Sequence, residues 1–188
     1  MEFTGSHLWE YHVKEKKKRA ILRQTAENEP EIVIDRLREE TIKEVVIPAE
    51  IDGYPVTEIG KKAFMNCKQL ESVVLPDTVS VIREEAFSGC ERLTWINFPM
   101  GLKHVMRGIF RNCISLEEVE FPSEMLSISI EIFQGCTSLK KVKFPEKLLL
   151  LGNHTFEDCV SLEYISLPVS VTNIHQTAFD GCYDLKIS

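Results

Sequence analysis

The sequence of 188 residues lacks any apolar run that approaches the roughly 18 to 20 residues of a membrane-spanning helix. Its N-terminus also lacks the apolar stretch of a signal peptide, because Glu2, His7, Glu10 and His12 interrupt it. Positive charge is scarce as well: 22 lysines and arginines against 29 aspartates and glutamates give a net charge of -7. We therefore expect no membrane insertion and no nucleic-acid partner. The chain is interpreted either as intracellular or as a mature or truncated form of an exported protein.

Motifs typical of metal-binding, phosphate-binding and catalytic sites are missing too. No CxxC or HxxxH pair is present, and the 5 histidines share no repeat position, so no zinc site is expected. There is no grouping of nucleophile, base and orienting residue, no glycine-rich phosphate loop and no pair of carboxylates in a cleft. We expect a protein that is not an enzyme and holds no cofactor. The one basic run, residues 14–19, is interpreted as a solvated hairpin tip.

What the sequence does contain is one regular spacing. A phenylalanine precedes each cysteine by three residues, and a leucine follows each by three. A period between 20 and 50 residues is typical of solenoids, propellers and other repeat arrays. The 6 cysteines follow one another at intervals of 23 residues: Cys67, Cys90, Cys113, Cys136, Cys159 and Cys182.

The equal spacing of the cysteines bears on whether they form disulfides. In a solenoid, equivalent positions of neighbouring coils lie about 4.8 Å apart. Their side chains point the same way, so the Cβ atoms lie farther apart than the roughly 3.8 Å that a disulfide prefers. We predict a ladder of buried thiols that pack as small apolar residues and perform no chemistry.

Each repeat reads as two short extended pieces and a turn. Residues 70–75 predict a strand with alternate side chains in the core, and Pro76 ends it because proline cannot donate to the next ladder. Residues 79–82 predict a second short strand on the opposite side of the coil. Residues 83–90 are too short for a full helix, and we expect one helical or 3₁₀ turn that places Phe87 in the core. The first repeat is longer by about five residues, which are expected to loop out near Gly53.

The N-terminal segment does not follow the repeat. Residues 9–13 alternate between apolar and polar, as do residues 20–22, which predicts an amphipathic β-hairpin. Residues 32–34 suggest another short strand, and the charge pattern of residues 34–43 is compatible with a helix. A solenoid needs its first hydrophobic coil covered, so this segment is interpreted as a cap.

The motif F-x-x-C-x-x-L-x-x-[VI]-x-[FL]-P closely resembles the BspA-like leucine-rich repeat, the 23-residue class of that superfamily. The resemblance covers residues 42–188, so the chain divides into a capping segment, 1–41, and a solenoid, packed as one domain. It implies a curved right-handed solenoid with a parallel β-sheet on the concave face and short strands and helical turns on the convex side. Such proteins are often bacterial, frequently at the cell surface, and are associated with adhesion and protein binding. No enzymatic activity travels with the resemblance.

One position departs from the pattern of that family. Glycine is common after the second short strand, as at Gly60 and Gly152, but the same position is held here by Arg83, Met106, Ser129 and His175. Either the backbone does not need a positive φ there, or those turns are bent differently.

In leucine-rich repeats the ligand usually meets the exposed strand positions, which the register identifies. Trp95 stands out because an outward-facing tryptophan is costly to leave in water and aromatics are enriched among binding hot spots. The alternative is that Trp95 only packs on its sheet neighbours, and the charged residues beside it favour cross-strand pairing over a ligand cradle. The candidates for binding a protein or glycan are Trp95, Tyr164, Asn97, Glu118, Glu120, Lys141 and Lys143.

Two other surfaces compete with this site. Leu126, Leu149 and Leu150 replace polar residues of other repeats and predict an exposed apolar patch on the convex side, unless they repack locally. The last repeat ends in residues 186–188 without a polar cap, and an open parallel edge invites pairing. The natural protein is therefore hypothesised to be longer or to associate with another copy through this edge. A structural or scaffolding repeat unit without a dedicated ligand site is the second functional hypothesis.

Overall fold

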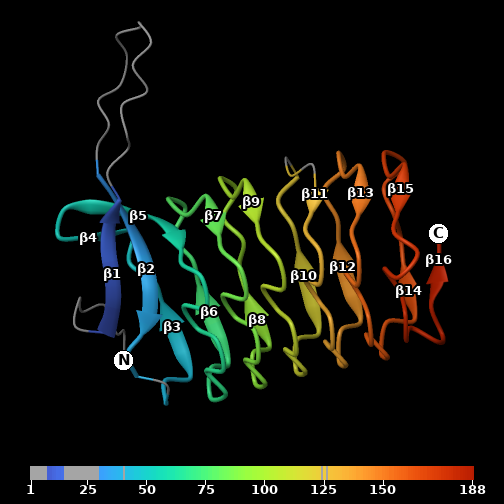
Figure 1. The fold of residues 1–188 in the computed structure, drawn as a ribbon, viewed down its shortest axis with the longest axis horizontal. Helices are drawn as coiled ribbons and strands as arrows, with labels where there is room; N and C mark the ends of the chain where they lie inside the picture. The colour runs from blue at the N-terminus through green and yellow to red at the C-terminus, as the bar shows by residue number, and fades with distance from the viewer. Residues whose placement is uncertain (1–7, 15–29, 40, 124, 126) are drawn as a thin grey trace, which may run out of the picture.

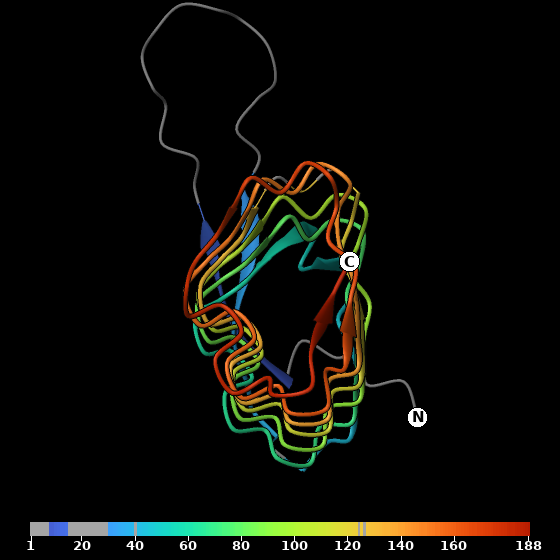
Figure 2. The same cartoon turned by 90° about the vertical axis from the view of Figure 1, so that its right-hand side faces the viewer.

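The computed structural model describes residues 8–14, 30–39, 41–123, 125 and 127–188. These residues form 16 β-strands and no α-helix. The chain winds in coils that stack along one axis (Figure 1), and the coils superimpose when the solenoid is viewed along that axis (Figure 2). The predicted leucine-rich repeat solenoid with parallel strands is confirmed.

One side of each coil is formed by the short strand that precedes the proline of each repeat. Neighbouring strands pair in parallel with a shift of one repeat, as in Ser72↔Trp95 and Glu118↔Lys141. We call the outward side chains of these strands the strand face. The strands are β3 (Glu44–Val46), β6 (Ser72–Val74), β8 (Trp95–Ile96), β10 (Glu118–Glu120), β12 (Lys141–Lys143), β14 (Tyr164–Ile165) and β16 (Lys186–Ile187).

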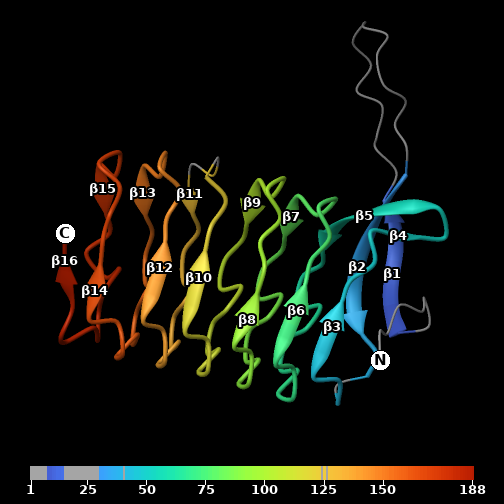
Figure 3. The same cartoon turned by 180° about the vertical axis from the view of Figure 1, so that it is seen from behind.

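The opposite side of the coils carries the second row of parallel strands, also visible from behind (Figure 3). We call the outward side chains of this row the back face. Its members are β2 (Glu31–Leu37), β5 (Tyr54–Ile59), β7 (Val81–Ile82), β9 (His104–Val105), β11 (Ser127–Ile128), β13 (Leu150–Leu151) and β15 (Asn173–Ile174).

The N-terminal segment adds an antiparallel strand to this second row. Strand β1 (Trp9–Lys14) pairs with β2, which pairs in parallel with β5. The predicted strand at residues 9–13 is therefore confirmed, but its partner is β2, and residues 20–22 lie outside the described residues. The helix expected at residues 34–43 is wrong, because its first four residues belong to β2, where Ile34 pairs with Tyr11 of β1 and Ile59 of β5.

The hairpin is fixed to the first coils by a buried carboxylate. Glu58 is 3% exposed and accepts hydrogen bonds from Lys14 and from the guanidinium of Arg83, at 2.6 Å from Nη2. Burial raises the pKa of Glu58, but the hydrogen bonds from both cations outweigh burial and hold the pKa below its usual value. Trp9 covers the end of the core, with its ring edge-on to Phe64 at 6.1 Å.

The extra residues of the first repeat form a tight hairpin, as expected near Gly53. Strand β4 (Glu50–Ile51) pairs antiparallel with the start of β5. Asp52 and Gly53 form the turn with φ of 52° and 81°, the combination that favours an Asp-Gly sequence.

The turn between the two rows of strands joins neighbouring coils in a third ladder. Alternate N–H groups close local turns, such as Cys90 N–H to Phe87 O at 3.2 Å. The intervening N–H groups donate to the next coil, such as Phe87 N–H to Ile109 O at 3.0 Å. The i→i−3 hydrogen bonds agree with the expected helical or 3₁₀ turn, and because the intervening donors serve the neighbouring coil, the segment forms single turns and no longer helix.

Phenylalanines and cysteines form two continuous columns in the core. Successive phenylalanine rings stack, with centroids 4.9 Å apart for Phe64 and Phe87 and 5.8 Å apart for Phe87 and Phe110. Each thiol from Cys90 onward donates to the phenylalanine carbonyl of the preceding coil, as Cys136 Sγ does to Phe110 O at 3.0 Å. The prediction of buried thiols is confirmed for all cysteines except Cys182, which is half-buried in the last coil.

Positive φ occurs at the residue directly before every cysteine. Asparagine or aspartate alternates there with glycine: Asn66, Gly89, Asn112, Gly135, Asp158 and Gly181. A Cβ at Gly89 would lie 2.2 Å from Asn66 Oδ1, so the side chain of one coil occupies the space that the next coil leaves empty.

The departure from the family pattern at Arg83 has a simple explanation. Neither Gly60 nor the residues at the equivalent positions have a positive φ, so the backbone does not need it there. Gly60 is required by close approach instead, because its Cβ would lie 2.5 Å from Ile34 O.

Removing one ring from the phenylalanine column is expected to destabilise the whole solenoid. Phe110→Ala should lower the free energy of unfolding by about 3–5 kcal/mol, because a fully buried ring leaves a cavity. Urea unfolding measures the change. Ile114→Ala, at an exposed position, is the control and should change stability by less than about 0.5 kcal/mol. Equal effects of the two substitutions would contradict the role of the column.

The buried thiols are expected to make the fold sensitive to alkali. Burial raises the pKa of Cys136 to about 12, from 9.0 for an unperturbed thiol, and also raises that of Cys113. Above pH 9.0 the unfolded chain loses thiol protons that the folded chain keeps, so the free energy of unfolding falls between pH 9.0 and about 12. Urea unfolding of a Cys113→Ala/Cys136→Ala variant provides the comparison. An identical pH slope for the variant and the wild type would contradict the expectation.

Candidate functional site

Trp95 projects from the strand face. It lies on β8 beside Ile96, and because side chains alternate along a strand, the burial of Ile96 directs Trp95 outward. The indole is 50% exposed, so about half of its surface is open to solvent. Tyr164, at the equivalent position of β14, is 63% exposed.

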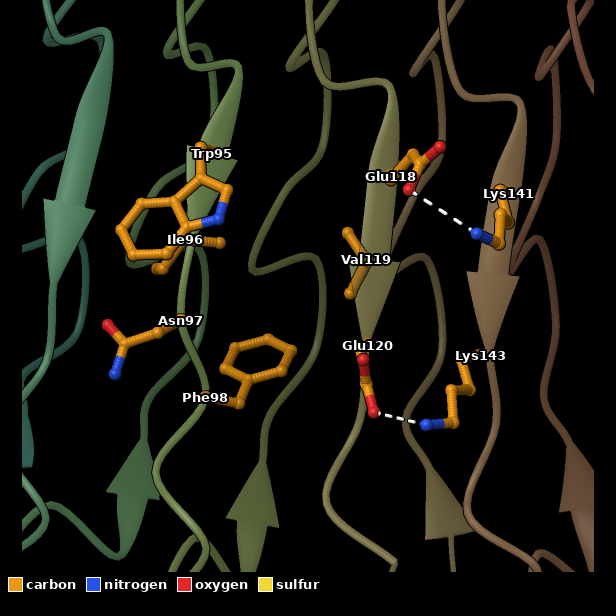
Figure 4. A pocket seen from close by; sticks show the side chains of 9 residues that line it. All are labelled: Trp95, Ile96, Asn97, Phe98, Glu118, Val119, Glu120, Lys141 and Lys143. Carbon is orange, nitrogen blue, oxygen red and sulfur yellow. Dashed lines mark hydrogen bonds and ion pairs between the residues drawn. The ribbon is translucent and has the colours of Figure 1, made fainter.

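A hollow of about 370 Å³ lies beside Trp95 on the strand face (Figure 4). It brings together six of the seven residues predicted for the strand-face site, all except Tyr164. Ile96, Phe98 and Val119, which the sequence analysis did not single out, complete its lining. The predicted residues that line the hollow are Trp95, Asn97, Glu118, Glu120, Lys141 and Lys143.

The hollow lies where the sheet is interrupted. Among the described strands, the strand-face sheet forms three hydrogen-bonded groups, β3-β6-β8, β10-β12 and β14-β16. At the end of β8 the Asn97 side chain takes the place of the main chain: its Oδ1 accepts from Leu75 N–H at 2.7 Å and its Nδ2 donates to Leu75 O at 3.0 Å. Asn97 is among the residues that line the hollow, but its amide points to the β6 side of β8, where both of its ends are already engaged (Figure 4).

The charged residues between Trp95 and Tyr164 pair across neighbouring strands, as predicted. Glu118 and Lys141 lie 3.6 Å apart, and Glu120 pairs with Lys143 (Figure 4). The register of β10 and β12 places each carboxylate directly opposite an ammonium. All four side chains are about two-thirds exposed, so the pairs contribute little to stability and can be rearranged at low cost.

A second hollow, which the sequence analysis missed, opens at the next interruption of the sheet, between β12 and β14. Its volume is about 700 Å³. Tyr164 stands on its rim, and Lys141 and Lys143 separate it from the first hollow. Its apolar lining is Val142, Phe144, Leu167, Pro168 and Val169. Little in the sequence indicated this hollow. Phe144 and Leu167 occupy a position that is apolar in every repeat, so they do not stand out from core residues.

The back face carries part of the predicted apolar patch. Leu149 and Leu150 are exposed, whereas Leu126 lies outside the described residues. Ile130 lies near Leu150, and both line a hollow of about 350 Å³ at the point where the second row of strands is interrupted, between β9 and β11. This patch stays an alternative site.

The last coil is only partly covered. Phe179 and Leu185 are half-buried, whereas Phe156 and Leu162 of the preceding coil are buried, and Ile187 is exposed. Self-association through this edge stays a prediction.

In the part of the chain that the structure describes, no three histidine, cysteine, aspartate or glutamate side chains are grouped closely enough to hold a metal ion. Within the same residues, no helix has the length and apolar character needed to span a membrane.

Loss of the Asn97 amide is expected to destabilise the fold. Asn97→Ala removes both hydrogen bonds to Leu75 and leaves these backbone groups without their partner, which costs about 1–3 kcal/mol in free energy of unfolding. Asn97→Asp keeps an acceptor for Leu75 N–H but turns a second acceptor oxygen toward Leu75 O, so it should also lose stability. Urea unfolding of both variants tests this, and a change within about 0.5 kcal/mol for Asn97→Ala would contradict the structural role.

Comparisons with known proteins agree with this architecture. The family described as the BspA type leucine rich repeat region matches residues 57–186 in 6 copies. The crystal structure of the Treponema pallidum leucine rich repeat protein superimposes with a TM-score of 0.86 at 34% identity, covering 100% of this chain and 81% of the other. A comparison with curated protein sequences gives no match.

Two longer solved structures share the fold. A Bacteroides ovatus leucine-rich repeat protein has a TM-score of 0.66 at 26% identity, and this chain, covered to 95%, spans 51% of it. A Faecalibacterium prausnitzii leucine rich cell surface protein has a TM-score of 0.72 at 22% identity, and this chain, covered to 100%, spans 54% of it. The matched repeats and the superposition together show that the chain belongs to the BspA-type leucine-rich repeat family, whose members are in general protein-interaction modules.

Proposed function

We propose that the protein is a non-catalytic interaction module that binds a segment of a partner protein on the strand face, with Trp95 as the main anchor. The observation that carries this proposal is the half-exposed indole at the edge of the 370 Å³ hollow. Large aromatic side chains that stand beside a concavity supply much apolar contact area at a low cost in side-chain entropy. Trp95 is therefore suited to act as a binding hot spot.

Tyr164 provides a second anchor at a distance that suits an extended segment. It lies three strands beyond Trp95, which is at least about 14 Å for a strand spacing of about 4.8 Å, because two of the three intervals are interruptions of the sheet. At least four to five residues of extended chain, at about 3.3 Å each, are needed to span that distance. A segment that crosses the strands would thus contact both aromatic side chains and the charged rows between them.

The paired charges on β10 and β12 form the polar part of this surface. Their side chains are exposed and pair with each other, so they are expected to govern orientation and association rate more than affinity. A glycan is the other ligand class for such a face. Adhesion at a bacterial cell surface is the setting that the family resemblance implies, and it stays a hypothesis.

A scaffolding role without a dedicated ligand site is the second candidate. It is favoured by the charged rows, which already satisfy one another, and by Asn97, whose amide is occupied by the backbone. In that case the repeats would only hold other elements at a fixed spacing, and no substitution on the strand face would affect binding.

Replacing the indole tests the proposal. Peptides selected from a phage-displayed library against the immobilised protein serve as probes, and isothermal titration calorimetry gives their Kd. Trp95→Ala should raise the Kd at least tenfold, which corresponds to about 1.4 kcal/mol of lost binding free energy.

The control is Leu150→Ala, which removes an exposed apolar side chain from the back face. It should leave the Kd unchanged. A loss of affinity in Leu150→Ala but not in Trp95→Ala would move the site to the back face. A glycan array that shows binding when no peptide binds would replace the partner class, and no binding in either assay would favour the scaffolding role.

A further inference from the structure

The C-terminal part of the strand face is basic in an acidic protein. The chain has a net charge of -7, yet the outward positions of β12, β14 and β16 hold three lysines and no carboxylate. Lys186 Nζ lies 5.6 Å from the centroid of the Tyr164 ring, within the range of a cation–π contact. The exposed residues on these strands and directly after β14 are Lys141, Lys143, Tyr164, Ser166 and Lys186.

The hollow of about 700 Å³ between β12 and β14 opens directly beside these cations. Phe144, Leu167 and Pro168 give it apolar walls, and Val169 is fully exposed at its edge. Glu146 is the one carboxylate in its lining. Neither the ion pairs between β10 and β12 nor the packing of the core needs an apolar concavity beside these ammonium groups.

We propose that this hollow binds an apolar side chain from an acidic segment of the partner protein, whose carboxylates pair with Lys141, Lys143 and Lys186. The inference rests on the proposed function and deepens it, because it assigns a second subsite and the chemistry of the partner. Trp95 anchors one end of the segment, and the hollow beside Tyr164 receives the other.

Lys141 and Lys143 can bind further carboxylates while they remain paired with Glu118 and Glu120. An ammonium has three donors, and Lys141 and Glu118 lie 3.6 Å apart with both side chains about two-thirds exposed. The glutamates lie on the β10 side of these lysines, so the side toward the hollow is open to a ligand. An anionic glycan would find the same ammonium groups, but its hydroxyls have few polar partners on the apolar walls, which favours a peptide.

Labelled peptides of about ten residues, which span roughly 33 Å when extended, test the proposal. The first consists of glutamate and serine with one central phenylalanine. The second has alanine in place of phenylalanine, and the third has lysine in place of glutamate. In fluorescence anisotropy titrations with the full chain, the first peptide should bind, the second at least fivefold more weakly, and the third not at all. Salt should weaken the binding of the first peptide.

The variants locate the subsite. Lys141→Ala/Lys143→Ala should weaken binding of the first peptide at least tenfold, and Tyr164→Ala should weaken it more than Tyr164→Phe. Lys103→Ala, which removes an exposed lysine beside the back-face hollow, is the matched control and should have no effect. Circular dichroism of each variant shows whether the fold is retained.

The inference is overturned if the first and third peptides bind equally, or if the double lysine variant binds as the wild type does. Binding of a sulfated oligosaccharide in place of the acidic peptide overturns it as well. If phage-selected peptides without acidic residues bind and lose affinity in Trp95→Ala, the proposed function stands while this inference fails.

Discussion

Hydrogen bonding between the backbones of successive coils is the constraint on which the rest of the structure depends. Every coil presents donors and acceptors to its neighbours along the two rows of strands and along the turn. These ladders form only if each coil repeats the shape of the last, so each inward position must hold a side chain of nearly the same size. The stacked phenylalanines and the thiols that donate to phenylalanine carbonyls satisfy that requirement.

The ladders on the two sides of the coil are interrupted at a few places, and three surface hollows lie at these interruptions. At the boundary between β8 and β10 the turn ladder continues, with Phe87 N–H donating to Ile109 O, so the coils stay attached while both rows of strands separate. On the other side of β8, the Asn97 amide bonds the backbone N–H and C=O of Leu75, just after β6. Local loss of backbone pairing thus creates the concavities in which Trp95 and Tyr164 stand.

Sequence reasoning located most of the strand-face site because the repeat fixes the register, and the register separates inward from outward side chains. It placed six residues that share one hollow, and it anticipated the pairing of Glu118 with Lys141. It missed the hollow beside Tyr164, because the shape of that hollow depends on how far β12 and β14 separate, which no repeat motif encodes. From the local charge pattern it allowed a helix at residues 34–43, part of which lies in β2. That expectation failed because the pairing of β2 with both β1 and β5 outweighs the local charge pattern.

The sequence by itself determined the period, the buried columns and the direction in which Trp95 points, because these follow from spacing and side-chain alternation. The sequence also contains the alternation of asparagine or aspartate with glycine before each cysteine, as at Asn66 and Gly89, which the sequence analysis did not use. It reflects the fact that the Asn66 side chain occupies the space that Gly89 leaves empty in the next coil. Only the tertiary structure decided where the pairing of neighbouring strands stops and which charges lie beside which hollow. Those outcomes depend on distances between coils, and such distances arise from the packing of the whole solenoid rather than from any one repeat.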